Sequence, residues 1–345
     1  MDELIEAIDS KQNPSVVGLD PKPEIVPAEI ISALADEVLQ EVTGEEALET
    51  LLSTAYFEFN RAIIDAVADI VPAVKPQIAM YEALGPAGMD TYAMTCDYAK
   101  SRGLIVIGDA KRGDIGSTAG QYAAHLSGFA NLSSYLSEDT KKLLQPSLVN
   151  LLSEYTNKNV WHEDSLTVNP YMGSDGVEPF ISQAEAHNKS IFVLLRTSNP
   201  SSKELQELIL QDGKPVYEHM ADLIENWGAA HVGKHGYSRV GAVVGATHPE
   251  EGKRLRELMP HTFFLVPGYG AQGGTAKDVA GMFDKNAEGA IVNSSRGIIG
   301  AWRKSENYAK NQGNMSLDDV LDIVRDSAYD AARNMRDDLR NAVYR

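Results

Sequence analysis

The run Leu104-Ile105-Val106-Ile107-Gly108-Asp109 decides the fold of this 345-residue chain, because its pattern occurs eight times. It is short, apolar and rich in β-branched residues, and it ends on a polar residue beside a glycine, as buried parallel strands often do. Similar runs are spread from one end of the chain to the other. The eight predicted strands are Ser15–Asp20, Ile70–Lys75, Leu104–Asp109, Ser165–Asn169, Ser190–Arg196, Arg239–Gly245, Thr262–Pro267 and Gly289–Asn293.

Stretches with helical periodicity separate these strands. The clearest are Glu45–Ala68, Met89–Arg102, Val177–Asn188, Pro215–Gly233, Pro249–Met259, Thr275–Phe283 and Leu317–Val343. Strand and helix in regular alternation imply parallel pairing, and closing the sheet leaves no exposed edge. The sequence therefore predicts an α/β protein with a (β/α)8 TIM barrel, in which residues 1–345 form a single domain.

Two connections are longer than a simple barrel needs. The first, Thr118–Glu163, is an extended crossover between strands 3 and 4, with helix-like pieces at Tyr122–Leu136 and Thr140–Tyr155. The second, Pro21–Gly44, follows strand 1 and contains the helix-like Ala28–Glu41. Both are expected over the mouth of the barrel, as lids or as packing surfaces.

Composition narrows the class of protein. A formal net charge of −18 is spread along the chain, which disfavours nucleic-acid binding because phosphates would be repelled. Cys96 is the only cysteine, so an internal disulfide and a cysteine-rich zinc site are excluded. The acidic start Met1–Glu6 is unlike a secretory signal, and no apolar run reaches transmembrane length. These features predict a cytoplasmic protein without membrane contact.

Polar residues gather at the carboxyl ends of the predicted strands. In TIM barrels these ends and the loops behind them build the active site, so the residues found there are candidates. They are Asp20, Lys75, Asp109 with Lys111, Asn169, Arg196, His248, Pro267 and Ser294-Ser295-Arg296.

The most informative cluster is Asp109, Lys111 and Asp114, at the end of strand 3. Alternation along a strand places Asp109 and Lys111 on one face, so the two side chains can touch. Nearby carboxylates favour the ammonium form of a lysine, which suits a proton donor better than a Schiff-base nucleophile. An ordinary salt bridge is the alternative for an isolated Asp-x-Lys, but charge clusters at a barrel mouth concentrate at functional sites.

This pattern, Asp-x-Lys-x-x-Asp followed by Ile115 and Thr118, resembles the signature of the orotidine 5′-phosphate decarboxylase family. Asp20 in Gly18-Leu19-Asp20-Pro21 and Lys75 in Val74-Lys75-Pro76 match its first acidic and first basic positions. The resemblance implies decarboxylation of orotidine 5′-monophosphate to UMP and CO2, the last step of de novo pyrimidine nucleotide synthesis. It also implies that Lys111 protonates a C6 carbanion, that Asp109 and Asp114 orient Lys111, and that no cofactor is needed.

The resemblance further implies a homodimer whose sites lie at the interface. Asp114, Ile115 and Thr118 would then reach into the partner's barrel. The long crossover and the turn Val168-Asn169-Pro170-Tyr171-Met172-Gly173 are similar to the longer, bacterial-type branch of the family, with Asn169 as a substrate-binding candidate.

A phosphate site is predicted at the loops after strands 7 and 8. The glycine-rich turn Val266–Thr275 contains Pro267 and Gln272 and precedes a helix whose free N–H groups and dipole favour an anion. Arg296 on the neighbouring loop can bind a phosphate through two N–H groups. A tight strand-to-helix connection is the alternative for the glycine turn alone. Gln272 and Arg296 also match phosphate-contacting positions of the family.

Other functions stay open at this point. A sugar-phosphate decarboxylase or synthase of the same superfamily would need Mg²⁺ and a carboxylate at strand 2, where Lys75 stands. A non-catalytic nucleotide-binding barrel would keep only the phosphate loops. A Schiff-base aldolase would need a neutral amine. His231, His235 and His261 lack metal-ligand spacing, and no metal site is predicted. Arg196 and His248 could equally pair with loop groups.

Overall fold

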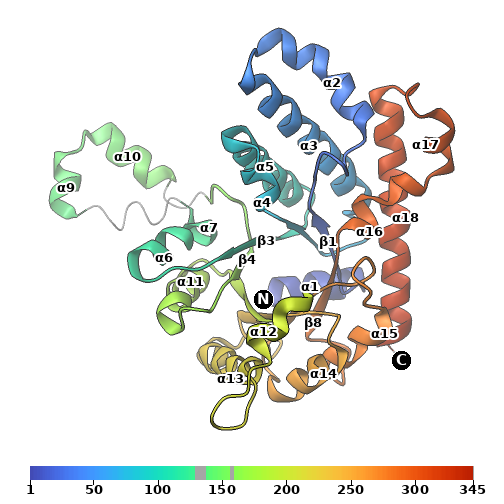
Figure 1. Ribbon diagram of the computed structural model, residues 1–345. Coiled ribbons are helices and arrows are strands. Elements are labelled where there is room, and N and C mark those ends of the chain that lie inside the picture. Colours follow the sequence, from blue (N-terminus) through green and yellow to red (C-terminus); the bar gives the residue numbers. More distant parts are fainter. Residues whose placement is uncertain (129–136, 156–158, 345) are drawn as a thin grey trace.

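Eight parallel strands form a closed barrel in the computed structural model, which describes residues 1–128, 137–155 and 159–344. The strands follow one another around the barrel in chain order, and the last pairs with the first through Ser15 and Val292. Figure 1 shows the chain as a ribbon, with helices around the strands. All eight predicted strands and the TIM-barrel class are confirmed. The strands are β1 (Ser15–Leu19), β2 (Ala73–Pro76), β3 (Ile105–Arg112), β4 (Ser165–Val168), β5 (Ser190–Arg196), β6 (Val240–Val244), β7 (Phe264–Pro267) and β8 (Ala290–Ser294).

Two strand boundaries differ from the prediction by three residues. Strand β2 begins at Ala73 because the N–H groups of Ile70 and Val71 bond to the carbonyl of Val67 and so finish the preceding helix. Strand β3 continues to Arg112, past Asp109, with an irregular register against β4 between Gly108 and Arg112. The longer β3 therefore includes Lys111 among its last residues.

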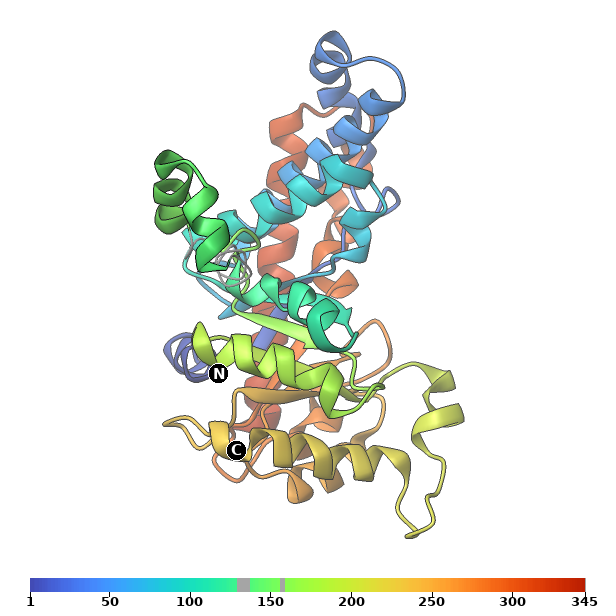
Figure 2. The same cartoon turned by 90° about the vertical axis from the view of Figure 1, so that its left-hand side faces the viewer.

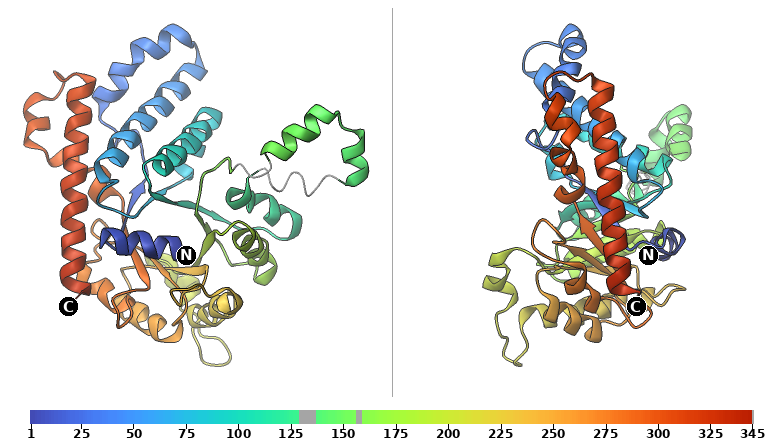
Figure 3. Two further views of the ribbon diagram at one scale, coloured as in Figure 1. Left: turned by 180° about the vertical axis from the view of Figure 1, so that it is seen from behind. Right: turned by 90° about the vertical axis from the view of Figure 1, so that its right-hand side faces the viewer.

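Helices surround the barrel, and the seven helices predicted between and after the strands all have counterparts. Figures 2 and 3 show them around the strands, with the long carboxyl-terminal helix running along one side. The α-helices are α1 (Asp2–Lys11), α2 (Ala28–Glu41), α3 (Glu45–Val67), α4 (Ala79–Glu82), α5 (Gly85–Ser101), α6 (Gly116–Tyr122), α7 (Ala124–Ser127), α9 (Glu138–Leu143), α10 (Pro146–Tyr155), α11 (Ser174–Ala186), α12 (Lys203–Gln206), α13 (Val216–Gly228), α14 (Pro249–Leu258), α15 (Ala276–Val279), α16 (Arg296–Ile299), α17 (Glu306–Asn311) and α18 (Leu317–Val343). Short 3-10 turns are η1 (Pro200–Ser202), η2 (Ala229–His231), η3 (Ala280–Met282) and η4 (Ala301–Lys304). Within the described ranges, no helix is both long and apolar enough to cross a bilayer.

The first helix, α1, closes the amino-terminal end of the barrel, a role that the sequence analysis did not predict. Its buried side chains Leu4, Ile5 and Ile8 pack with inward-facing strand residues such as Val16 and Ile107. Inward and outward apolar residues alternate along the strands, so the barrel interior and the layer under the helices are separate clusters.

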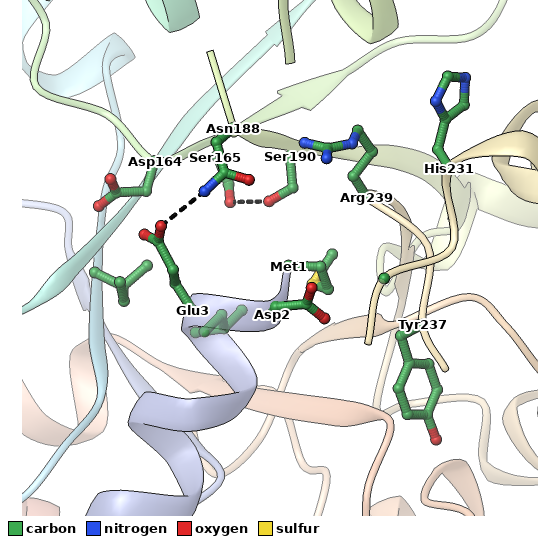
Figure 4. A pocket seen from close by; sticks show the side chains of 13 residues that line it. Met1, Asp2, Glu3, Asp164, Ser165, Asn188, Ser190, His231, Tyr237 and Arg239 are labelled. Carbon is green, nitrogen blue, oxygen red and sulfur yellow. Dashed lines mark hydrogen bonds between the residues drawn. The ribbon is translucent and has the colours of Figure 1, made fainter. Parts of the chain in front are cut away.

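Figure 4 shows a polar pocket at this closed end. Ser165 and Ser190, which begin β4 and β5, line it and bond to each other at 2.6 Å, and Asn188 donates to Glu3 at 2.8 Å. The pocket therefore lies opposite the carboxyl ends of the strands, where barrel chemistry is sited.

The extended crossover between β3 and β4 is confirmed, but its first helical part differs from the prediction. The sequence predicted one helical piece at Tyr122–Leu136. The structure has α6, which ends at Tyr122, and the short α7, which ends at Ser127, and residues 129–136 lie outside the described part. The second predicted piece is split into α9 and α10, which project from the barrel in Figure 1.

A buried cluster holds the base of this crossover against the barrel. His125 Nδ1 lies 3.1 Å from Glu163 Oε2, the Tyr92 hydroxyl donates to Glu163 Oε1, and the Trp161 ring stacks on His125 at 4.7 Å. Gly108 leaves room for the Glu163 carboxylate, because a Cβ there would lie 2.3 Å from Oε1.

Candidate active site

The charged residues at the ends of β2 and β3 form one connected network. Lys75 Nζ donates to Asp109 Oδ2 at 2.6 Å, and Lys111 Nζ donates to Asp109 Oδ1 at 2.5 Å. Asp109 and Lys75 are buried, at 7% and 4% exposure, whereas the Lys111 side chain is 45% exposed. The predicted contact between Asp109 and Lys111 is confirmed, and Lys111 is the most exposed member of the network.

The backbone gives Lys111 its position. Its φ is +48°, a left-handed conformation that is uncommon for residues other than glycine. Thr167 on β4 stabilises this turn, because its hydroxyl accepts the N–H of Lys111 at 2.9 Å and donates to Asp109 Oδ1 at 3.1 Å. Simple strand alternation is therefore not what brings Lys111 to Asp109. Unusual backbone conformations of this kind cluster at functional sites.

Electrostatics keep the inner pair ionised. Burial acts to lower the pKa of Lys75, but the carboxylates of Asp109 and Asp20 outweigh burial and the pKa is raised. Burial likewise acts to raise the pKa of Asp109, but Lys75 and Lys111 outweigh it and the pKa lies well below its usual range. The inner pair is thus a buried carboxylate beside a buried ammonium at neutral pH.

Two adjoining pockets open over this network. The first has a volume of about 1020 Å³, counting the space at its mouth, and Lys75, Asp109 and Lys111 line it. The second has a volume of about 740 Å³, and Arg296 and Lys22 line it. They share Asp20, Pro267, Gln272 and Asn293, so a single elongated ligand can occupy both. We call them the reactive pocket and the phosphate pocket, after the roles that the sequence analysis predicts for their residues.

The predicted helix-terminal contribution to the phosphate pocket is not supported. Helix α15 has only 4 residues, and the Thr275 hydroxyl accepts the N–H of Asp278 in a capping box. The N–H groups of Gly270, Gly273 and Gly274 bond to carbonyls of the same loop. Asp278 also adds a negative charge at this helix end, so an anion in the phosphate pocket would rely on side-chain donors, among them Arg296, Gln272 and Lys22.

Four predicted site residues lie outside both pockets. Asp114 accepts the N–H of Ile115 at 2.7 Å, Ile115 is 52% exposed, and Thr118 is exposed on α6. Asn169 is exposed, and its Oδ1 accepts the N–H of Tyr171. The other seven predicted residues, Asp20, Lys75, Asp109, Lys111, Pro267, Gln272 and Arg296, line the pockets.

The sequence analysis missed several residues of the reactive pocket. Thr197, Ser198 and Asn199 form one wall, and Thr167 and Asn293 lie on others. The polar run directly after β5 was a readable signal, because loops after barrel strands carry site residues. Thr167 had a weaker signal, as a polar residue within a buried strand. Arg196 is fully buried and bonds to loop groups, and His248 pairs with it.

Comparisons with known proteins identify the family of this chain. A sequence model described as the orotidine 5′-phosphate decarboxylase / HUMPS family matches residues 16–148 and 146–310. The chain is 42% identical over 290 residues to an orotidine 5′-phosphate decarboxylase of Rhodopirellula baltica, covering 84% of each chain. It is 37% identical over 345 residues to one of Caldicellulosiruptor bescii, covering 99% of this chain and 98% of the relative.

Solved structures give the same result. A structure of Leishmania donovani UMP synthase matches with a TM-score of 0.66 at 26% identity and covers 99% of this chain, which spans 56% of that longer protein. A structure of Leishmania donovani OMP decarboxylase matches with a TM-score of 0.65, covering 100% of this chain and 98% of that one. At 24% identity, the second likeness concerns the fold alone.

Proposed function

Because the chain belongs to the orotidine 5′-phosphate decarboxylase family and converts orotidine 5′-monophosphate to UMP and CO2, we propose that Lys111 is its proton donor. The observation that carries this role is the network in which the ammonium of Lys111 is held by Asp109 at the mouth of the reactive pocket. Loss of CO2 from C6 leaves a carbanion with no adjacent electron sink. The protein must therefore supply the stabilising charge.

Lys111 can do so directly. An ammonium about 4 Å from a developing negative charge contributes roughly 4 kcal/mol at an effective dielectric near 20. Its side chain is 45% exposed and lines the reactive pocket, and the carboxylate of Asp109 holds its ammonium in place for C6. The same ammonium then transfers a proton to C6, giving UMP.

The buried neighbours have a supporting role in the proposal. Lys75 neutralises the second oxygen of Asp109, so the carboxylate stays ionised and fixes the direction of Lys111. Asp20, whose Oδ1 is buried without a hydrogen-bond partner, faces the region shared by both pockets and is available to a substrate donor. This arrangement is preorganised before the substrate binds.

The phosphate pocket would hold the 5′-phosphate of the substrate. Arg296 and Gln272 are the proposed contacts, with Pro267 in the shared wall. Binding energy gained at the phosphate, remote from C6, can be used to hold the reacting carboxylate against the charged network. A substrate bound by its phosphate in one pocket and reacting at its base in the other requires the two pockets to be continuous.

We propose a homodimer of single-domain cytoplasmic chains, with sites at the interface. Asp114, Ile115 and Thr118 follow β3 but lie outside the pockets of their own chain. Such exposed groups, including an apolar isoleucine, are suited to reach a partner's site. Asn169, on the neighbouring β4 loop, would support this surface.

The test is to follow the loss of substrate absorbance on addition of orotidine 5′-monophosphate, with and without a chelator. Wild-type protein should turn over in both conditions, whereas Lys111→Ala should lose decarboxylation and retain measurable UMP binding. Near-normal turnover by Lys111→Ala would overturn the role of this lysine. The named relatives are decarboxylases of this substrate, so the alternatives of a magnesium-dependent sugar-phosphate enzyme and a non-catalytic barrel are not favoured.

A further inference from the structure

The buried arginine at the end of β5 has contacts that differ from those of the catalytic network. Arg196 is 0% exposed, and its guanidinium donates to Ser202 Oγ at 2.7 Å and pairs with Glu207. Arg196 Nη2 also lies 3.1 Å from His248 Nδ1. A register shift between Leu194 and Arg196 accounts for the direction of this side chain.

That shift reverses the face to which Arg196 belongs. Leu194 lies opposite Val243, which lines the reactive pocket, but Arg196 lies opposite Val244 in the outer layer. An irregularity of this kind redirects a side chain without ending the strand. Arg196 therefore lies behind the wall of the reactive pocket instead of in it.

The groups around Arg196 hold the loop that follows it. Gln206 Oε1 accepts the N–H of Thr197 at 3.0 Å, and Gln206 Nε2 donates to the Thr197 hydroxyl at 2.9 Å. His248 Nε2 lies 3.1 Å from the carbonyl oxygen of Thr197. Since that carbonyl can only accept, Nε2 carries the proton and Nδ1 is free to accept from Arg196. Burial and the charge of Arg196 lower the pKa of His248, in agreement with this neutral form.

Ser198 is held by close packing as well. A Cβ on Gly245 would lie 2.8 Å from the Ser198 Cα, and one on Gly268 would lie 3.4 Å from the Ser198 Cβ. The Thr247 hydroxyl donates to the Ser198 carbonyl at 3.2 Å. The loop after β5 is thus joined to the loops after β6 and β7.

We propose that Arg196 and His248 are a positioning pair, which fixes Thr197, Ser198 and Asn199 as the wall of the reactive pocket that receives the base of the substrate. This inference rests on the proposed placement of the phosphate at Arg296. The three loop residues line the reactive pocket and are absent from the lining of the phosphate pocket. Loss of the pair should weaken recognition of the base and spare recognition of the phosphate.

The molecule offers a matched control. Arg256 on α14 is also buried, at 8% exposure, and donates to the carbonyls of Met259, Thr262, Met282 and Gly289. The last of these residues precedes β8, so Arg256 stabilises the amino-terminal side of the barrel. Its removal should destabilise the fold without changing either pocket.

The experiment compares Arg196→Met and Arg256→Met, using UMP and ribose 5-phosphate as competitive inhibitors of orotidine 5′-monophosphate turnover. For Arg196→Met, KM and the inhibition constant of UMP should rise at least about tenfold, with the inhibition constant of ribose 5-phosphate within about twofold of wild type. Arg256→Met should lower the melting temperature and leave all three constants unchanged. Unchanged UMP inhibition in a folded Arg196→Met protein, or equal weakening of both inhibitors, would overturn the proposal.

His248→Leu provides the second variant, in case Arg196→Met does not fold. It removes the donor to Thr197 but leaves the pairing of Arg196 with Glu207, so UMP inhibition should weaken in the same direction by about three- to fivefold. No change in His248→Leu would count against the pair. Wild-type protein that does not decarboxylate the substrate would refute the catalytic proposal instead, and direct binding of UMP and ribose 5-phosphate to the same variants would still decide the positioning role.

Discussion

The segment from Asp109 to Thr118 has an inner part that lines a pocket and an outer part that does not. The inner part, Asp109 to Lys111, lies in the reactive pocket, and its charges are joined to each other and to Lys75. The outer part, Asp114 to Thr118, begins three residues later and lies outside both pockets, with Ile115 half exposed. This difference underlies the proposed division of roles, in which a chain orients its lysine through its own Asp109 and the outer part completes the site of another copy.

The largest effect on activity should come from substituting one residue of each part and then combining the two variants in one dimer. Lys111→Ala and Asp114→Ala should each lose at least about 10³-fold in activity, because one removes the proton donor and the other removes a carboxylate that orients it. When the two variants are mixed and allowed to exchange subunits, about half of the dimers are hybrids with one intact site of two. The turnover assay should then recover about a quarter of wild-type activity.

Two controls make this result interpretable. Mixing Lys111→Ala with Asp109→Ala should restore nothing, because both residues belong to the same site of one chain. Ion-exchange chromatography should confirm that subunits exchange, because a hybrid dimer has a net charge between those of the two homodimers. Exchange without recovery in the first mixture would mean that Asp114 serves its own chain, and the division of roles would be wrong.

The second effect is on stability. Asp109→Asn would leave the buried ammonium of Lys75, 4% exposed, without its ionic partner, and breaking a buried pair in this way costs about 3–5 kcal/mol. Asp114→Asn, on the outer part, should change the free energy of unfolding by about 0.5 kcal/mol or less. Urea unfolding at one fixed protein concentration measures both. Equal losses of unfolding free energy in Asp109→Asn and Asp114→Asn would contradict the distinction between the inner and outer parts.

The pH dependence follows from the lowered pKa of Asp109. A carboxyl whose pKa is lower in the folded state binds fewer protons there, so its contribution to stability is complete above the unfolded value of about 3.9. That contribution is lost as pH falls further toward the folded value. The difference in unfolding free energy between wild type and Asp109→Asn should therefore be constant from pH 7 to about 5 and shrink below about pH 4. A difference that already shrinks above pH 5 would contradict the assigned direction.

The sequence could predict the inner part because the barrel itself brings strand ends together. Once eight strands alternate with helices, Asp20, Lys75 and Asp109 must converge at one end of the barrel. The left-handed turn at Lys111 and the redirection of Arg196 were not accessible, because both depend on register shifts between neighbouring strands. The capping box at Thr275 was different: Thr-x-x-Asp before a helix is a readable pattern, and it predicts that the N–H groups of Thr275 and Asp278 are already bonded and are not offered to an anion.

The smallest effect concerns the apolar residue of the outer part. Ile115→Asp puts a charge on a side chain that is 52% exposed in one chain, so the folded monomer should lose little stability. If Ile115 is buried between two chains, the same charge should weaken dimerisation by about 1–3 kcal/mol, measured by sedimentation equilibrium. Leu39→Asp on α2, at 55% exposure, is the matched control and should leave the dimer unchanged. A dimer that tolerates Ile115→Asp but dissociates with Leu39→Asp would place the interface on α2, and the outer part would then need an explanation within its own chain.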